Sequence, residues 1–511
     1  MFAHPVVVSH ERGQGRCMDQ AGDQGGRTVR AALGQVTSYA RELAMSPQCW
    51  QVIAAVALAN LAVLLMNRVL FPLFDPVFTY ARDISITFSA AVVIGLALVS
   101  LARPSLLRGR ALVVVMLGGL LLGAALIGAA VVLGWPVLLV VGACLFVSGR
   151  GWATLASLLA SVRLPVPQAM ACLPLGLALG QLLDQPVRLL PQPVCVVVLV
   201  AAAALSLLLS APQAARLVDE IAVAPPAPEL SVTRPASYLP LTSAVYVCLI
   251  LAQGAFGFAL RFGETAGSPA FNSLAVPFML AMVALVIALR GRYFGDALVN
   301  VVVLVLVAGF LLVIVGGAAN VELAASVLTV GTSLFNILLY TTLAALAGRN
   351  VLAALSIVGW GQGLSSLSTT LGAFAGTSAN RMVLAGSHEQ LALLMAAVTL
   401  ALVAYALFGL RGFSFERTIA GVVPPEPTID LERAGEEAFA TRCAELAARF
   451  DLTPREAEVF EMLARGRNRE HIEGALSVSR NTVKAHVKHV YAKLDIHSHQ
   501  ELIDLFEDER S

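Results

Sequence analysis

Apolar runs of about twenty residues recur along most of this chain, and a run of that length crosses a bilayer as one helix. The pattern predicts six runs, a linker over 211–237 rich in Pro and Ala, and six more runs. The weakest assignments are 135–184, which Arg150 and Arg163 interrupt, and the Gly/Ser-rich stretch 361–376, so eleven or thirteen spans stay open as alternatives. The predicted spans are 49–71, 84–102, 111–132, 135–149, 166–184, 193–210, 238–260, 271–290, 297–318, 323–346, 350–376 and 389–410.

Composition separates this apolar region from a soluble one. The 511 residues are 58% hydrophobic and 13% charged, with a mean hydropathy of +0.80, which excludes a soluble enzyme. Only 25 of the 363 residues in 48–410 are charged, against 33 of the 101 residues that follow. We therefore expect a cytoplasmic tail over 1–47, a membrane domain over 48–410, a linker with a connecting helix over 411–450, and a soluble domain over 451–511.

Arginine placement predicts the orientation of the membrane domain. With the N-terminus inside, ten arginines fall in inner loops and five at outer loops and span ends. The tail 1–47 adds five more and lacks the apolar segment of a cleaved signal peptide. Twelve spans then place both termini in the cytoplasm. The ten inner arginines are Arg103, Arg108, Arg110, Arg150, Arg163, Arg216, Arg234, Arg290, Arg292 and Arg349, and the five outer ones are Arg68, Arg82, Arg188, Arg261 and Arg381.

Polar residues inside the predicted spans are the candidates for a ligand site. No Asp or Glu lies near the middle of a predicted span, which argues against proton-coupled transport. Asn60, Gln253 and Asn336 are candidates to line a cavity for an uncharged or weakly polar ligand, and Arg68 and Arg261 are candidates to contact it. The alternatives are hydrogen bonds between helices for the amides and snorkelling to the interface for the arginines.

Two six-helix halves joined by a cytoplasmic linker resemble the major facilitator superfamily over about 48–410. The family's loop between spans two and three usually reads G-x-x-x-D-R-x-G-R-R. Here Arg108-Gly109-Arg110 retains the closing Arg-Gly-Arg, but no Asp precedes it within Leu101–Leu107. The resemblance implies a transporter-like bundle, and the missing Asp argues against the conformational coupling of a working transporter.

The soluble region begins with a Pro-rich linker and continues as helices. Pro424–Pro427 should be extended and stiff, and 431–450 has the spacing of a helix. Thr453-Pro454-Arg455-Glu456 is a capping box with Pro at the first helical position. A second short helix lies between Asn468 and Leu476, and Ser498–Glu501 begins a fourth.

The third helix of this region has one apolar and one basic face. Ser479 caps a helix that starts at Arg480, in which Val483, Val487, Val490 and Leu494 recur on one side. All three lysines of the protein lie in this helix: Lys484, Lys488 and Lys493. Four short helices with a tight turn before a basic one are typical of a helix-turn-helix DNA-binding domain.

These stretches resemble the LuxR/NarL-type helix-turn-helix family over about 60 residues. The matching segments are Leu452–Glu456, Ser479–Val487 and Tyr491–Leu494, whereas His471-Ile472-Glu473 replaces the usual Glu-Ile-Ala. Glu473 is either solvated at the edge of the motif or loosens it. The resemblance implies DNA contacts by Arg480, Asn481, Thr482, Lys484 and Lys488, of which Lys484 is the strongest candidate. It also implies a homodimer on double-stranded DNA, formed through Leu502, Ile503 and Phe506 of the fourth helix.

The sequence therefore predicts an all-α protein, a polytopic membrane bundle of about 12 spans (6+6) followed by a four-helix DNA-binding domain. We expect a one-component transcriptional regulator in the bacterial cytoplasmic membrane, whose membrane domain senses an unidentified small molecule. The alternative is an active transporter with a regulatory DNA-binding tail, and a third is a plain membrane anchor. No catalytic motif, metal-ligand spacing or cofactor motif is present, and the seven cysteines form no C-x-x-C pair, so we expect neither an enzyme nor a metal site.

Overall fold

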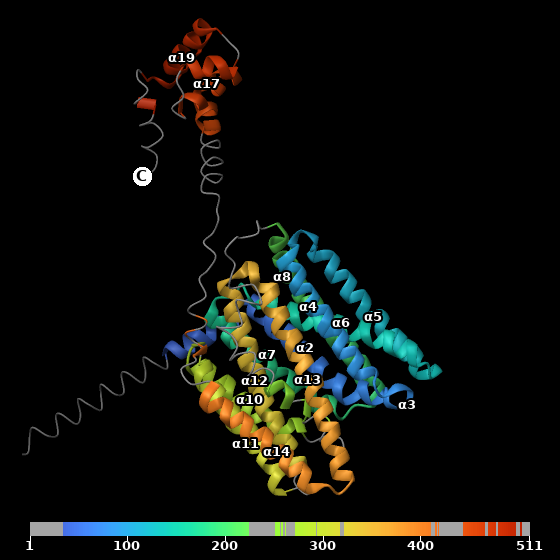
Figure 1. Cartoon of the computed structure of the whole chain (residues 1–511). Coiled ribbons are helices and arrows are strands. Elements are labelled where there is room, and N and C mark those ends of the chain that lie inside the picture. Colours follow the sequence, from blue (N-terminus) through green and yellow to red (C-terminus); the bar gives the residue numbers. More distant parts are fainter. Residues whose placement is uncertain are drawn as a thin grey trace, which may run out of the picture. The chain divides into compact units, whose positions relative to one another are not determined.

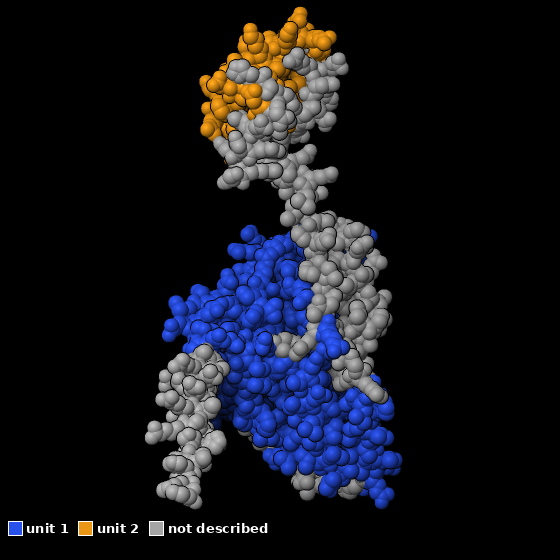
Figure 2. Space-filling model, turned by 90° about the vertical axis from the view of Figure 1, so that its left-hand side faces the viewer, with its two compact units in different colours: residues 1–424 blue, residues 425–511 orange. Residues whose placement is uncertain are grey.

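The chain divides into two compact units, residues 1–424 and residues 425–511, which are coloured separately in Figure 2. Every regular element in the described residues is a helix. The computed structural model describes residues 34–223, 251–255, 257–258, 261, 271–292, 294–316, 321–409, 414–415, 417, 419, 443–464, 469–476, 479–496 and 501–502.

The first unit is a bundle of long helices that falls into two halves (Figure 1). Its first half contains α2 (Pro47–Leu65), η1 (Met66–Leu70), η2 (Phe71–Leu73), α3 (Asp75–Phe78), α4 (Ala81–Ala102), η3 (Pro104–Leu106), α5 (Gly109–Leu133), α6 (Pro136–Ser161), α7 (Val166–Val187) and α8 (Gln192–Val223). Its second half contains α10 (Phe271–Ala288), α11 (Gly295–Gly316), α12 (Val321–Arg349), η7 (Val351–Ala353), α13 (Ala354–Leu384), α14 (His388–Ala404) and η8 (Tyr405–Gly409).

Ten helices in the described part of the chain are long and apolar enough to cross a membrane. A shorter apolar stretch, Leu274–Ala288, lies in α10. Most of the predicted span 238–260 lies outside the described residues. The multi-span, all-helical architecture is therefore confirmed, and the count of twelve stays a prediction.

The predicted end of the fourth span, at residue 149, is wrong. Helix α6 continues through Arg150 to Ser161. The alanines and leucines after Arg150 are good helix formers that pack inside the bundle, and Trp152, Leu155 and Leu158 are all nearly inaccessible to solvent. Because these residues are buried, the helix continues beyond Arg150, and Arg150 does not lie in an inner loop.

The predicted central linker also begins later than expected. Helix α8 runs to Val223, thirteen residues into the segment 211–237. Leu217, Val218 and Ile221 recur at helical spacing and are buried, which extends the apolar face of α8. The residues from 224 to 237 lie outside the described residues.

The two halves meet along pairs of helices. Within the first half α2 packs on α7 and α8, and α5 packs on α6; within the second, α11 packs on α12 and α14. Between the halves α4 packs on α13, and α7 packs on α10 and α12. Small residues allow close approach between the halves, because a Cβ on Gly363 of α13 would overlap the side chain of Ile94 on α4.

The second unit has its own hydrophobic core. It contains α17 (Pro454–Ala464), α18 (Arg469–Leu476) and α19 (Arg480–Leu494), preceded by helical residues 443–449. Val459 and Phe460 of α17, Ile472 of α18, and Val483 and Val490 of α19 are fully buried together. This core fixes which face of α19 is left exposed.

Candidate DNA-recognition helix and membrane cavity

Helix α19 begins at a side-chain cap, as the sequence predicts. Ser479 has extended backbone, and its Oγ accepts the N–H of Thr482 at 3.3 Å. The helix ends at Asp495, whose φ of 55° is left-handed. The cap and the left-handed stop set the helix at 15 residues, about four turns.

The two faces of α19 are separated as predicted. Val483, Val487, Val490 and Leu494 are at most 4% exposed and face the core. The five residues predicted to contact DNA are all exposed: Arg480, Asn481, Thr482, Lys484 and Lys488. They extend from the first turn to the middle of the helix, which is the part of a recognition helix that meets base edges and phosphates.

Lys493, the third lysine, has a different role. Its Nζ donates to Glu456 Oε2 at 2.8 Å and to the carbonyl of Asp451 at 2.7 Å. Glu456 also completes the predicted capping box, because its Oε2 accepts the N–H of Thr453 at 2.9 Å while Thr453 Oγ1 accepts the N–H of Glu456. The hydrogen bonds from Lys493 and Thr453 lower the pKa of Glu456 to about 2. Lys493 therefore ties the end of α19 to the start of α17.

Glu473, where the sequence departs from the Glu-Ile-Ala of the resembling family, faces α19. Its side chain is about one quarter exposed, and its Oε1 lies 4.0 Å from Arg480 Nε. The side chain is partly exposed, but Oε1 is buried without a hydrogen-bond partner and lies opposite the positive charge at the start of α19. This placement reduces the net positive potential there.

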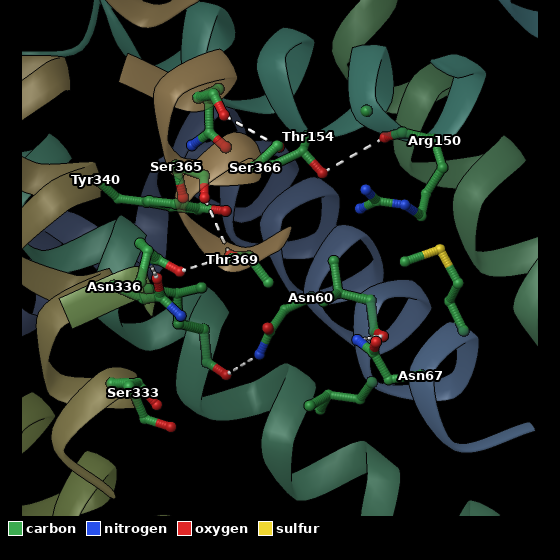
Figure 3. A pocket seen from close by; sticks show the side chains of 18 of the residues that line it. Asn60, Asn67, Arg150, Thr154, Ser333, Asn336, Tyr340, Ser365, Ser366 and Thr369 are labelled. Atoms are coloured by element: carbon green, nitrogen blue, oxygen red, sulfur yellow. Dashed lines mark hydrogen bonds between the residues drawn. The ribbon is translucent and has the colours of Figure 1, made fainter. Parts of the chain in front are cut away.

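The first unit holds a cavity of about 140 Å³ between its two halves (Figure 3). Polar and apolar groups share its wall about equally, and within the described residues none of the side chains that line it is acidic. Arg150 extends into the cavity from α6 (Figure 3). The polar lining residues are Asn60, Asn67, Ser89, Arg150, Thr154, Gln181, Gln253, Thr329, Thr332, Ser333, Asn336, Tyr340, Gln362, Ser365, Ser366 and Thr369.

Three of the five predicted ligand residues line this cavity. Asn60 lines it while its Nδ2 donates to the carbonyl of Leu177 at 2.9 Å. Gln253 and Asn336 both line it and are joined by a 2.6 Å hydrogen bond from Gln253 Nε2 to Asn336 Oδ1. Each of these amides therefore forms a hydrogen bond to a neighbouring helix and also borders the cavity.

The two predicted arginines lie elsewhere, in ion pairs. Arg68 Nη2 lies 2.9 Å from Asp184 Oδ1, and Arg188 Nε lies 2.9 Å from Asp184 Oδ2. Asp184 is completely buried at the end of α7. Arg261 lies 3.9 Å from Asp83 in the first turn of α4. Neither Arg68 nor Arg261 is part of the cavity wall.

Residues 451–506 match the family described as bacterial regulatory proteins, luxR family. The C-terminal segment is a LuxR-type helix-turn-helix domain. It is 47% identical over 55 residues to an HTH-type transcriptional regulator in the exeN 3′ region of Aeromonas salmonicida, covering 11% of this chain and 28% of that protein. It is 37% identical over 65 residues to the uncharacterized response regulatory protein YgeK of Escherichia coli strain K12, covering 12% and 44%. The chain thus spans less than half the length of these two relatives.

Two solved transporter structures each match 70% of this chain at low sequence identity. One is the human organic anion transporter MFSD10 (TM-score 0.47, 16% identity, covering 70% of this chain and 100% of that one). The other is FucP, a major facilitator superfamily transporter in the outward conformation (TM-score 0.39, 15% identity, covering 70% and 98%).

The predicted dimer contacts of the LuxR-type domain are only partly described. Leu502 is fully buried in the core of its own unit, so it stabilises the monomer and offers no free side chain. Ile503 and Phe506 lie outside the described residues. The role of the fourth helix in dimerisation stays a prediction.

Sequence reasoning missed the charged residue of the cavity. The sequence prediction ends a span just before Arg150, because a charge interrupts the apolar run there. The signal that places it inside a helix is the mostly apolar segment after it, Trp152–Leu159, which contains neither Pro nor Gly. Among the described residues, no cluster of His, Cys, Asp or Glu could hold a metal ion.

Proposed function

We propose that this protein is a membrane-embedded one-component transcriptional regulator that binds double-stranded DNA through α19. The observation that carries the proposal is the exposed polar face of α19 in a domain of the luxR family. Arg480, Asn481 and Thr482 lie where base edges are contacted, and Lys484 and Lys488 add positive charge along the same helix. The protein acts as a homodimer on an inverted repeat, from the bacterial cytoplasmic membrane with both termini in the cytoplasm.

The cavity of the first unit is the sensor site in this proposal. It lies between two helical halves that contact each other through a few helix pairs, so a molecule bound there touches both halves. Asn60 comes from the first half, and Gln253 and Asn336 come from the second. A ligand that prefers one arrangement of the halves shifts the population toward it.

A contact at the end of the first unit joins the membrane helices to the segment that leads to the DNA-binding domain. Asp296, in the first turn of α11, accepts the N–H of Phe415 and the hydroxyl of Ser414. Phe415 is 2% exposed and belongs to the core cluster of the bundle. The start of the segment leading to the DNA-binding domain is therefore held by α11, and a shift of α11 moves it.

Genome-wide DNA occupancy in the native host tests the proposal. Intact protein should give discrete peaks that Lys484→Ala abolishes and that Lys484→Arg, which keeps the positive charge, largely retains. Absence of peaks in the intact protein over several growth conditions would overturn the proposal. Membrane levels of all three proteins, measured by immunoblot, control for expression.

The rival function is a transporter with a regulatory tail. The polar cavity between the two halves is the observation that favours it, since transporters hold substrate in such a place. It predicts substrate flux that survives deletion of residues 431–511. The regulator proposal instead predicts a signal response, and deletion of these residues should abolish it.

A further inference from the structure

One side chain gives the membrane cavity a net charge. Arg150 lies midway along the 26-residue helix α6, and it is the charged member of a wall that is otherwise amides, hydroxyls and apolar groups in the described residues. Its Nε is buried and has no hydrogen-bond partner. A guanidinium in the middle of a membrane span is costly, and such groups pair with an opposite charge or mark the path of a ligand. No acidic residue described in the wall supplies that pair.

The second half of the bundle adds further donors beside Arg150. Gln362 on α13 lines the cavity, and its Nε2 is buried without an acceptor. Tyr340 on α12 lines the same cavity and carries a phenol hydroxyl. Donors from three helices, α6, α12 and α13, therefore border one cavity. Buried hydrogen-bond donors that lack an acceptor, in a wall with no acidic side chain among the described residues, are complementary to an oxyanion.

The rest of the wall limits the size and character of what binds. A cavity of about 140 Å³ compares with the roughly 150 Å³ that an engineered protein cavity uses to hold one benzene molecule. Asn336 and Thr369 border the same space (Figure 3). Gln181 is 3% exposed and leaves its Oε1 without a donor. These groups suit a compact molecule with polar edges.

We propose that the cavity binds a small organic carboxylate, one ring or a short chain in size, whose oxyanion is held by Arg150 with Gln362 and Tyr340. The proposal rests on the sensor role given to this cavity above. It also gives that role a mechanism, because Arg150 belongs to the first half of the bundle and Gln362 and Tyr340 to the second. The bound carboxylate links the halves and favours the arrangement in which α6 lies close to α12 and α13.

Thermal unfolding of the purified full-length protein in detergent, followed by tryptophan fluorescence, tests the proposal. The probes are matched pairs of acid and neutral amide: benzoate against benzamide and butanoate against butanamide, at constant ionic strength. A carboxylate should raise the Tm of the wild-type protein and its amide should not. In Arg150→Gln the carboxylate affinity should fall by about thirtyfold or more, as for truncation of a buried charge pair. Arg150→Lys should retain part of the response.

Arg163→Gln is the matched control, because it removes an arginine of the same unit that is half exposed and pairs with Glu220. It should respond to benzoate as the wild type does. Equal shifts with acid and amide, a carboxylate response that survives Arg150→Gln, or no response to either carboxylate would each overturn the proposal. The comparison of acid with amide is made on wild-type protein, so its result does not depend on whether a variant folds. DNA occupancy lost in Lys484→Ala would stand in any of these cases, which separates failure of the ligand class from failure of the regulator.

Discussion

Lys493 near the end of α19 lies 2.8 Å from Glu456 near the start of α17, measured from Nζ to Oε2. The pair and the Thr453 cap lower the pKa of Glu456 to about 2. A carboxyl whose folded pKa lies below its unfolded value stabilises the fold above the unfolded pKa, near 4.5, and loses that contribution as the pH falls through the folded value. The free energy of unfolding of residues 425–511 should therefore fall as the pH drops from about 4.5 toward 2.

Glu456→Gln isolates this contribution. It should lower the free energy of unfolding at pH 7 by about 1–2 kcal/mol through loss of the charged hydrogen bond and weakening of the cap. It should also flatten the pH dependence between the two pKa values. Urea unfolding followed by circular dichroism on residues 425–511 measures both effects. Glu458→Gln, an exposed neighbour on α17 that pairs with Arg455, should leave the pH profile as in the wild type.

The architecture of both regions follows from local sequence rules. Apolar runs and their lengths predict the membrane helices, and the caps at Thr453 and Ser479 predict where α17 and α19 begin. These features depend on neighbours within one helical turn, which a sequence displays. The exposed face of α19 follows for the same reason, since the spacing of its valines fixes the buried side.

The cavity depends on contacts that the sequence does not display. Arg68 and Arg150 both interrupt apolar runs, yet Arg68 pairs with Asp184 across 116 positions while Arg150 enters the cavity. Composition cannot distinguish them, because the partner of Arg68 comes from another helix. The burial of Asp184 was missed likewise, since its position at a span end resembles that of an exposed residue. Arg68 lies in η1, which continues α2, and the packing of α2 against α7 brings it close to Asp184.

Lys488 should act on DNA through charge more than through sequence. It is exposed on α19 one turn beyond Lys484, and we expect it to contact phosphates. Lys488→Gln should weaken binding to specific and unrelated DNA by similar factors and reduce the slope of log K against log salt by about one. Fluorescence anisotropy of the full-length protein in nanodiscs, titrated at several salt concentrations, measures the slope. A loss confined to the specific sequence would instead assign Lys488 to base contacts, and Lys488→Arg should preserve the slope.

Asp184 should be a main electrostatic support of the first half of the bundle. It is completely buried and accepts from Arg68 on one oxygen and Arg188 on the other. Asp184→Asn leaves two arginines facing an uncharged group, and removal of one member of a buried charge network costs about 3–5 kcal/mol. We expect a markedly lower Tm in detergent. Asp75→Asn, which removes an exposed acid from the first turn of α3, should change the Tm little.

The contact of Asp296 with Ser414 and Phe415 should decide whether the signal leaves the membrane domain. Asp296→Ala removes the acceptor for both donors, while Phe415→Ala removes the buried anchor of the same segment. Both variants should reach the membrane and give DNA occupancy that no longer changes with growth conditions, because the linker no longer follows α11. Phe415→Leu keeps an apolar anchor and should retain the response, and Asp75→Asn controls for loss of an acid from a helix start. DNA occupancy that still responds fully to growth conditions in both Asp296→Ala and Phe415→Ala would show that the signal travels by another path. The packing of α4 against α13 would then be the next contact to test.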